Sequence, residues 1–244
     1  MAVTLEASIK EDDGRLLVDV SGELTLVEVA ALRDQLMKCL AEQPEALIVN
    51  IAEMTVSEPL ALAVFPAVAR QAAQWPGISM LLCAPTPDVR TSLRQAAYRR
   101  LPLLASIEQA RERAHDERES LPVLTDELLP ISGAARQARN VATDACLRWD
   151  LPDLVGPASL IVSELVSNVV DHAHTMMSLR LSLTSRYLQI SVRDGSSAEP
   201  RLSPDLSPDI SGGRGLKLVD ATARAWGCLP CAGGKVVWAS LPWS

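Results

Sequence analysis

The stretch 163-SELVSNVVDHAH-174 decides how the second half of this 244-residue chain folds. Glu164, Asn168 and His172 follow one another at intervals of four within an otherwise apolar segment. Residues four apart are neighbours on a helix surface, so this spacing predicts a helix with a polar stripe beside an apolar one. The apolar stripe comprises Ile161, Leu165, Val166, Val169 and Val170. We expect it to pack beneath a sheet while the polar stripe lines a ligand site. The alternative is a helix whose polar residues make only local hydrogen bonds.

The segments that follow supply the rest of such a site. Residues 178–196 predict two alternating strands joined by a tight turn, and the second strand ends in Asp194. A loop rich in Ser, Pro and Asp, long enough to act as a lid, covers 196–212. It leads into 211-SGGRGLKLVDATARAW-226, a glycine-rich turn followed by a helix. Residues 233–243 predict a closing strand. A helix with a polar stripe, a strand ending in Asp and a glycine turn therefore occur in this order.

Each group suits a nucleotide ligand. A glycine turn at a helix start offers free backbone N–H groups and the positive end of the helix dipole to phosphates. Gly213 and Gly215 let the backbone come close, and Arg214 or Lys217 can add positive charge. Asn168 suits a Mg²⁺ ion that takes its other ligands from phosphates and water.

Two carboxylates complete this expected site. Glu164, one turn from Asn168, can accept a proton from an attacking hydroxyl or water. Asp194 can accept a hydrogen bond from an exocyclic amine such as that of adenine.

In this order the motifs resemble the Bergerat ATP-binding fold of the GHKL superfamily, specifically the anti-sigma factor serine kinases, over residues 122–244. The resemblance implies that Glu164 is the catalytic base and Asn168 the Mg²⁺ ligand. It also implies ATP as the bound nucleotide. The residues expected to contact it are Asn168, His172, Asp194, Gly195, Gly212, Gly213, Arg214, Gly215 and Leu216. Two features depart from the family pattern: Ser196 and Ala198 replace glycines of the first glycine box, and Val236 stands where the last strand often carries Thr or Ser.

The first half alternates between strands and helices. The strands are expected at 15–24, 46–54, 78–85 and 101–106, and the helices at 25–43, 58–74 and 87–100. This alternation predicts a largely parallel sheet covered by helices. Thr25 and Glu28 form a capping-box pair at the first helix, and Ser57 is the expected N-cap of the second.

This half resembles a STAS domain, the fold of anti-sigma factor antagonists. The resemblance rests on 18-VDVSGELTLVEVAALRDQL-36 and 47-LIVNIAEMTVSEPLALAVF-65. In that family the second stretch carries a phosphorylated serine, but the matching position here is Leu60, and a family aspartate is Asn50. The fold class is therefore α/β plus α+β. The expected domains are a STAS-like domain at 1–112, a charged linker at 113–121 and the ATP-binding domain, an α/β sandwich, at 122–244.

Composition excludes several other classes. A net charge of -7 with few aromatic residues argues against direct nucleic-acid binding. The chain starts without a signal-peptide pattern, and the apolar run 59–69 is too short to cross a bilayer, so we expect a cytoplasmic protein. The 228-CLPC-231 pair has redox or zinc spacing, but no second ligand pair accompanies it, and we interpret it as a structural turn between strands.

The sequence thus predicts a partner-switching regulator of transcription. Its ATP-binding domain would phosphorylate a serine on a separate STAS partner, sequester a sigma factor, or do both. The resemblance also implies a homodimer through this domain. The competing hypothesis is a non-catalytic module in which ATP sets which partner binds. A two-component histidine kinase is disfavoured, because no apolar helix pair with a phosphoacceptor histidine precedes the ATP domain.

Overall fold

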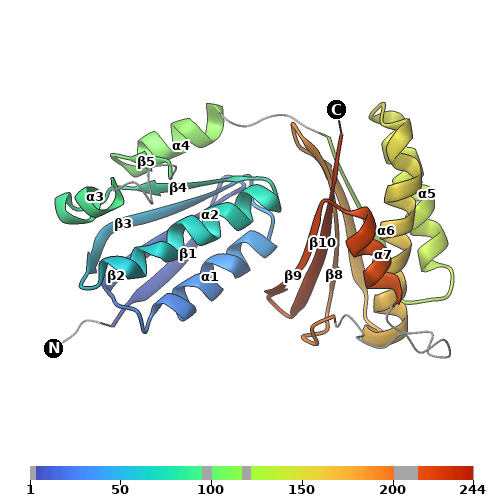
Figure 1. Cartoon of the computed structure of the whole chain (residues 1–244), viewed down its shortest axis with the longest axis horizontal. Coiled ribbons are helices and arrows are strands. Elements are labelled where there is room, and N and C mark those ends of the chain that lie inside the picture. Colours follow the sequence, from blue (N-terminus) through green and yellow to red (C-terminus); the bar gives the residue numbers. More distant parts are fainter. Residues whose placement is uncertain (1–3, 95–100, 117–121, 201–213, 244) are drawn as a thin grey trace. The chain divides into compact units, whose positions relative to one another are not determined.

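The computed structural model describes residues 4–94, 101–116, 122–200 and 214–243. The chain forms two compact units, 1–119 and 120–244 (Figure 1). Each unit contains its own five-stranded sheet with helices packed on it. The expected mixture of an α/β half and an α+β half is confirmed.

The first sheet has the strand order β1-β2-β3-β4-β5. Its strands are β1 (Glu6–Asp12), β2 (Arg15–Leu24), β3 (Ala46–Val56), β4 (Ser79–Cys83) and β5 (Leu103–Leu104). The pairs from β2 to β5 are parallel, as the alternating pattern predicts. The edge strand β1 pairs antiparallel with β2 and was not predicted, because most of its side chains are exposed and it carries no apolar run.

The helices of this unit are α1 (Val29–Ala41), α2 (Val64–Gln74), α3 (Pro87–Leu93) and α4 (Ile107–Asp116), and a 3₁₀ turn, η1 (Pro59–Ala63), precedes α2. In Figure 1, α1 and α2 lie side by side along the sheet. Ala46 and Ile48 of β3 pack in one core with Ala110 and Ala114 of α4. Because side chains alternate along a strand, Leu47 and the other residues of opposite parity face the other side of the sheet.

Two expected helix caps differ from the structure. Thr25 Oγ1 donates a hydrogen bond to the Glu28 carboxylate, but α1 begins after Glu28 and has no side-chain cap. Ser57 does not cap the next helical segment, because the N-cap residue is Glu58. The Glu58 carboxylate instead accepts a hydrogen bond from the Leu26 N–H at 2.8 Å. This bond links the segments that follow the paired ends of β2 and β3.

The expected charged linker at 113–121 also differs in its first part. Residues 113–116 continue α4, and Ala114 is buried against the first sheet. Alanines at 110 and 114 are four apart and form a narrow apolar stripe, which the many charged neighbours conceal in the sequence. Residues 117–121 lie outside the described part of the chain.

The second sheet is antiparallel throughout, with the order β6-β7-β8-β10-β9. Its strands are β6 (Val123–Leu128), β7 (Met177–Leu183), β8 (Tyr187–Asp194), β9 (Ala225–Cys231) and β10 (Gly234–Pro242). The helices are α5 (Ala134–Arg148), α6 (Val155–Asn168) and α7 (Arg214–Thr222), with a 3₁₀ turn η2 (Pro152–Leu154) and a π turn η3 (Val169–Ala173) flanking α6. The sequence did not predict β6 or β9, whose polar and cysteine residues hide the strand pattern.

Helix α6 is the central helix of this unit. Ala138 and Ala142 of α5 are fully buried in the same core as Ile161, Val162 and Val166 of α6, and such small residues let two helices approach closely. Pro152–Ala173, which contains α6, is long and apolar enough to pass a length-and-composition test for a membrane span. Ile161, Val162 and Val166 of this segment are buried in the core of the second unit.

The CxxC pair lies on a strand and not in a turn. Cys228 and Cys231 both belong to β9, and the turn to β10 follows them. Burial raises the pKa of the Cys228 thiol to about 11, which disfavours the reactive thiolate. Within the described residues, no group of three or more His, Cys, Asp or Glu side chains could hold a metal ion. The raised pKa agrees with a structural role for the Cys228 thiol.

Candidate functional site

The glycine turn and the polar stripe meet at Glu164 and Gly215. The Glu164 carboxylate lies against the backbone of Gly215 so closely that an added Cβ would collide with Oε2 and lie 3.2 Å from Cδ. Helix α7 packs on α6, which positions this contact. The half-buried Glu164 carboxylate therefore lies beside the first turn of α7, near the positively polarised end of that helix.

The polar stripe is not carried by one regular helix. Asn168 is the last residue of α6, and the next five residues form the π turn that contains His172. The turn closes with the His174 N–H donating to the Val169 carbonyl at 2.8 Å, and His174 has a left-handed backbone. A π turn holds more residues than an α turn, so His172 is displaced from the line of Glu164 and Asn168. Asn168 is half-buried, whereas His172 is exposed.

Asp194 is buried at the end of β8. The antiparallel register places it opposite Lys235 of β10, and both face the helix layer, as Val192 and Val237 do. Asp194 Oδ1 accepts hydrogen bonds from Lys235 Nζ at 2.9 Å and from the Ser196 N–H at 2.7 Å. Asp194 Oδ2 is buried without a hydrogen-bond partner.

A hydrogen bond links the backbone after Asp194 to the segment that follows α6 and the π turn. The Gly195 N–H donates to Thr175 Oγ1 at 3.0 Å, and a Cβ at Gly195 would lie 3.2 Å from Thr175 Cγ2. Thr175 lies two residues after the π turn, so this bond holds Gly195 against the stretch that begins at Glu164. The Ser196 N–H donates a hydrogen bond to Asp194 Oδ1 at 2.7 Å, which fixes the chain at this point.

The other expected contacts fall into two groups. Gly212 and Gly213 lie outside the described residues, and Arg214 is the first residue of α7. Leu216 is buried in the core of the second unit, so only its backbone can face a ligand. Lys217, one residue further, is half-buried.

Sequence reasoning missed Lys235. The sequence analysis placed Val236 at the position of the last strand that lies near the adenine base. In the structure Val236 pairs with Arg193, and its side chain points to the face of the sheet away from the helices. Lys235 is the residue opposite Asp194. A basic residue directly after 233-GG-234, where the strand starts, was the available signal.

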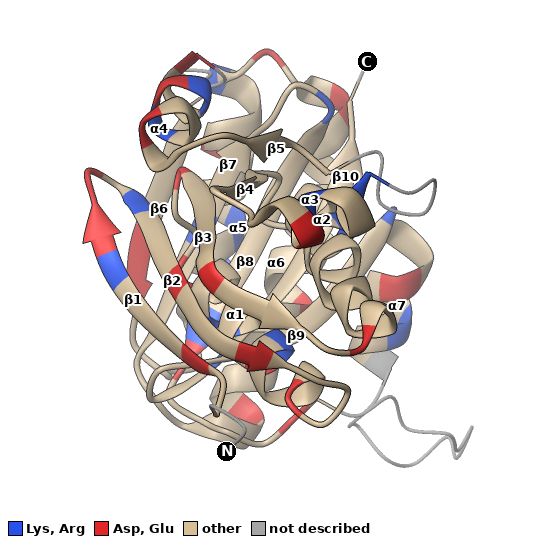
Figure 2. Ribbon diagram, turned by 90° about the vertical axis from the view of Figure 1, so that its left-hand side faces the viewer, with Lys and Arg blue, Asp and Glu red and all other residues tan. Residues whose placement is uncertain are grey.

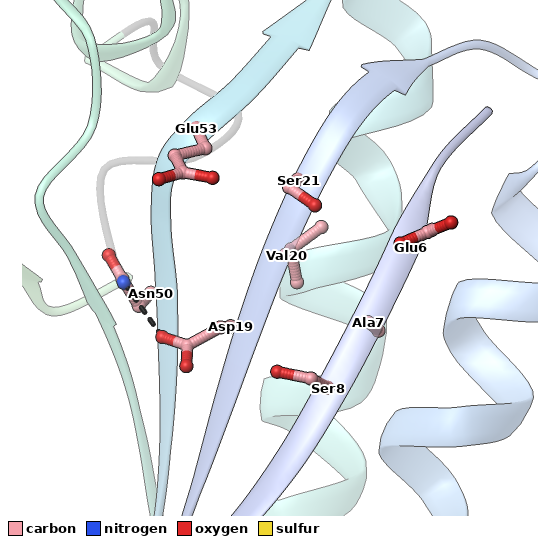
Figure 3. Close-up of a pocket in the computed structure, with 8 residues that line it drawn as sticks. All are labelled: Glu6, Ala7, Ser8, Asp19, Val20, Ser21, Asn50 and Glu53. Carbon is pink, nitrogen blue, oxygen red and sulfur yellow. Dashed lines mark hydrogen bonds between the residues drawn. The ribbon is translucent and has the colours of Figure 1, made fainter. Parts of the chain in front are cut away.

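A hollow of about 420 Å³ lies on the first unit, over β1, β2 and β3 (Figure 3). Three carboxylates line it, those of Glu6, Asp19 and Glu53, and acidic residues recur along these strands (Figure 2). Asn50 Nδ2 donates to Asp19 Oδ1 at 2.8 Å. Hydrogen bonds from Lys10 and then Asn50 lower the pKa of Asp19. The amide at position 50 thus supports a carboxylate that a second aspartate would repel.

Comparisons with known proteins divide the chain as the structure does. The model of the STAS domain matches residues 6–113, and that of the histidine kinase-like ATPase domain matches residues 132–240. This chain therefore consists of a STAS domain followed by a histidine kinase-like ATPase domain. No curated protein matches it.

Several solved structures resemble parts of the chain. An anti-sigma factor antagonist from Mycobacterium paratuberculosis is 20% identical, covering 46% of this chain and 96% of its own, with a TM-score of 0.41. The antagonist SpoIIAA in its unphosphorylated form is 16% identical, covering 47% of this chain and all of its own, with a TM-score of 0.39. The RsbU and RsbW domains of Rv1364c from Mycobacterium tuberculosis are 20% identical, covering 49% of this chain and 32% of their own, with a TM-score of 0.35.

The side chains in the second unit fit a nucleotide chemically. Because Gly215 has no Cβ, its backbone can lie beside the Glu164 carboxylate. Asp194 Oδ2 has no hydrogen-bond partner and can accept a hydrogen bond from a base amine. ATP binding is the property that the ATPase domain implies. Together the two domain types point to a regulatory protein that works by partner switching.

Proposed function

We propose that the second unit binds Mg-ATP and transfers the γ-phosphoryl group to a serine of a separate STAS protein in the cytoplasm. The contact between Glu164 and the Gly215 backbone carries this proposal, because it joins the candidate base to the candidate phosphate turn. In this role Glu164 accepts the proton of the serine hydroxyl, and Asn168 supplies one oxygen ligand to Mg²⁺. Bound ATP supplies the phosphoryl group.

The proposal also covers the partners. A sigma factor is the second expected partner, held inactive by the same unit, and the ATP-binding domain is the expected contact of a homodimer. These assignments follow from the resemblance to anti-sigma kinases and from the domain pair.

The STAS domain of this chain is proposed to be a pseudo-partner that is not phosphorylated. Leu60 is 74% exposed on η1 and carries no hydroxyl. Val27 is 84% exposed. It follows Leu26, whose N–H donates a hydrogen bond to the Glu58 carboxylate just before η1. Exposed apolar side chains on two segments that are linked in this way favour a protein contact over a phosphorylation site.

The first test is calorimetric titration with Mg-ATP. Asn168→Ala should remove the magnesium dependence of ATP binding, with ADP and GTP as control ligands. Glu164→Ala should keep the affinity for ATP but abolish transfer of labelled phosphate to isolated STAS proteins that carry the acceptor serine. Removal of a general base typically costs about 10²–10⁴-fold in rate.

A non-catalytic ATP-dependent binding module is the second candidate. The ion pair between Lys235 and Asp194 favours it, because it occupies one oxygen of the expected base contact. If wild-type protein binds Mg-ATP but transfers phosphate to none of the STAS proteins, the module stands and the kinase proposal fails.

A further inference from the structure

Lys235 occupies the carboxylate to which a base amine would bind. Its Nζ donates to Asp194 Oδ1 at 2.9 Å and to the Ser196 carbonyl at 3.2 Å. The Lys235 side chain is 11% exposed and that of Asp194 1% exposed. The lysine thus joins the last strand to the loop after β8 and encloses the aspartate.

Neither oxygen of Asp194 is exposed to solvent in this arrangement, and only one of them is hydrogen-bonded. Oδ1 already accepts two hydrogen bonds, from Lys235 and from the Ser196 N–H. Oδ2 is buried and has no partner. A buried acceptor without a hydrogen bond costs free energy, which favours any rearrangement that brings a donor to it.

We propose that Lys235 closes the base subsite of the free protein and leaves Asp194 when a purine amine binds there. This inference rests on the proposed nucleotide-binding function. The lysine is suited to the exchange, because its flexible side chain carries a compact, strongly hydrated charge that water can accept. The amine then donates to the carboxylate in place of the ammonium.

The closed arrangement lowers the apparent affinity for ATP. For a ligand that binds only the open state, the apparent dissociation constant equals the intrinsic dissociation constant divided by the fraction of open molecules. The phosphate groups of the ligand do not contact Asp194 in this scheme, so only the contribution of the base is reduced. Lys235 therefore determines how strongly the site prefers a nucleotide over a bare triphosphate.

The test measures Mg-ATP and inorganic tripolyphosphate binding by calorimetry on the full chain. Lys235→Thr should tighten ATP binding by about tenfold or more while tripolyphosphate affinity stays unchanged. Lys235→Gln retains a donor toward Asp194 and should give a smaller effect in the same direction. Lys10→Thr is the matched control, since it removes another lysine–aspartate ion pair, with Asp19, that lies in the first unit.

Thermal melts followed by circular dichroism establish that each variant is folded. If Lys235→Thr does not fold, Lys235→Gln decides the outcome. Unchanged or weaker ATP binding in a folded Lys235 variant overturns the inference, and so does equal tightening for tripolyphosphate. In either case ATP binding by wild type still supports the nucleotide-binding part of the proposed function. If neither wild type nor any folded Lys235 variant binds ATP, both fail. If only the variants bind ATP, the inference is supported and the proposed function of the wild-type protein fails.

Discussion

At the scale of single residues, Gly215 matters for the space it leaves. The Glu164 carboxylate occupies the volume that any side chain at position 215 would need. Gly156, in the same helix as Glu164, has no neighbouring atom within 4 Å of an added Cβ. Two glycines in one unit thus offer opposite environments for the same substitution.

We predict that Gly215→Ala displaces Glu164 and lowers phosphoryl transfer by about tenfold to a hundredfold, because a shift of about 1 Å in a catalytic group has effects of this size. Transfer rates of purified wild type and variant measure the effect. Gly156→Ala is the control, and it should leave transfer unchanged and raise the free energy of unfolding by about 0.5 kcal/mol. Equal rates for wild type and Gly215→Ala would contradict the role given to this contact.

At the scale of elements, one carboxylate connects three strands of the first sheet. Asp19 of β2 accepts hydrogen bonds from Lys10 of β1 and Asn50 of β3, each at 2.8 Å. These bonds lower the pKa of Asp19 below its ordinary value of 3.8. A lowered folded-state pKa stabilises the fold above the unfolded value, and this contribution is lost as pH falls through the folded value.

We predict that Asp19→Asn lowers the free energy of unfolding of the first unit by about 1 kcal/mol at pH 7. The exposed lysine keeps this figure small. The difference from wild type should shrink as pH falls below 3.8 and through the lower pKa of folded Asp19, where the wild-type carboxylate becomes protonated. Urea unfolding at neutral and acidic pH measures it, and a difference that grows toward low pH would rule out this linkage.

At the scale of the whole molecule, two units each hold a complete sheet and core. Residues 1–119 contain all five strands of the first sheet, and residues 120–244 contain all five of the second. Strand order in neither sheet requires a strand from the other unit. Such units have what a domain needs in order to fold by itself.

We therefore predict that fragments 1–119 and 120–244 fold separately, each with a cooperative thermal transition. Circular dichroism of the two purified fragments tests this, and the full chain serves as the reference. A fragment that melts without a cooperative transition would show that it depends on the other unit.

The sequence predicted much of the architecture because local patterns control it. The helical spacing in 163–174 reflects burial of one face of a helix, and the apolar run of β3 reflects burial of both faces of a strand. Such patterns can be recognised within a single segment of the sequence. Strand β1 escaped prediction because an exposed edge strand needs no apolar run. The caps expected at Thr25 and Ser57 differed because Thr25 pairs with Glu28 before the helix begins, and because Glu58 is the N-cap residue of the next segment.

The sequence by itself determined the order of motifs, and thereby the two domain types and the candidate residues Glu164, Asn168 and Asp194. Only the tertiary structure decided which of these groups touch. The contact of Glu164 with Gly215 depends on how α7 packs on α6, and the pairing of Asp194 with Lys235 depends on the register of β8 and β10. Both join residues about 40 to 50 positions apart, and such contacts are set by sheet register and helix packing, which local periodicity does not encode.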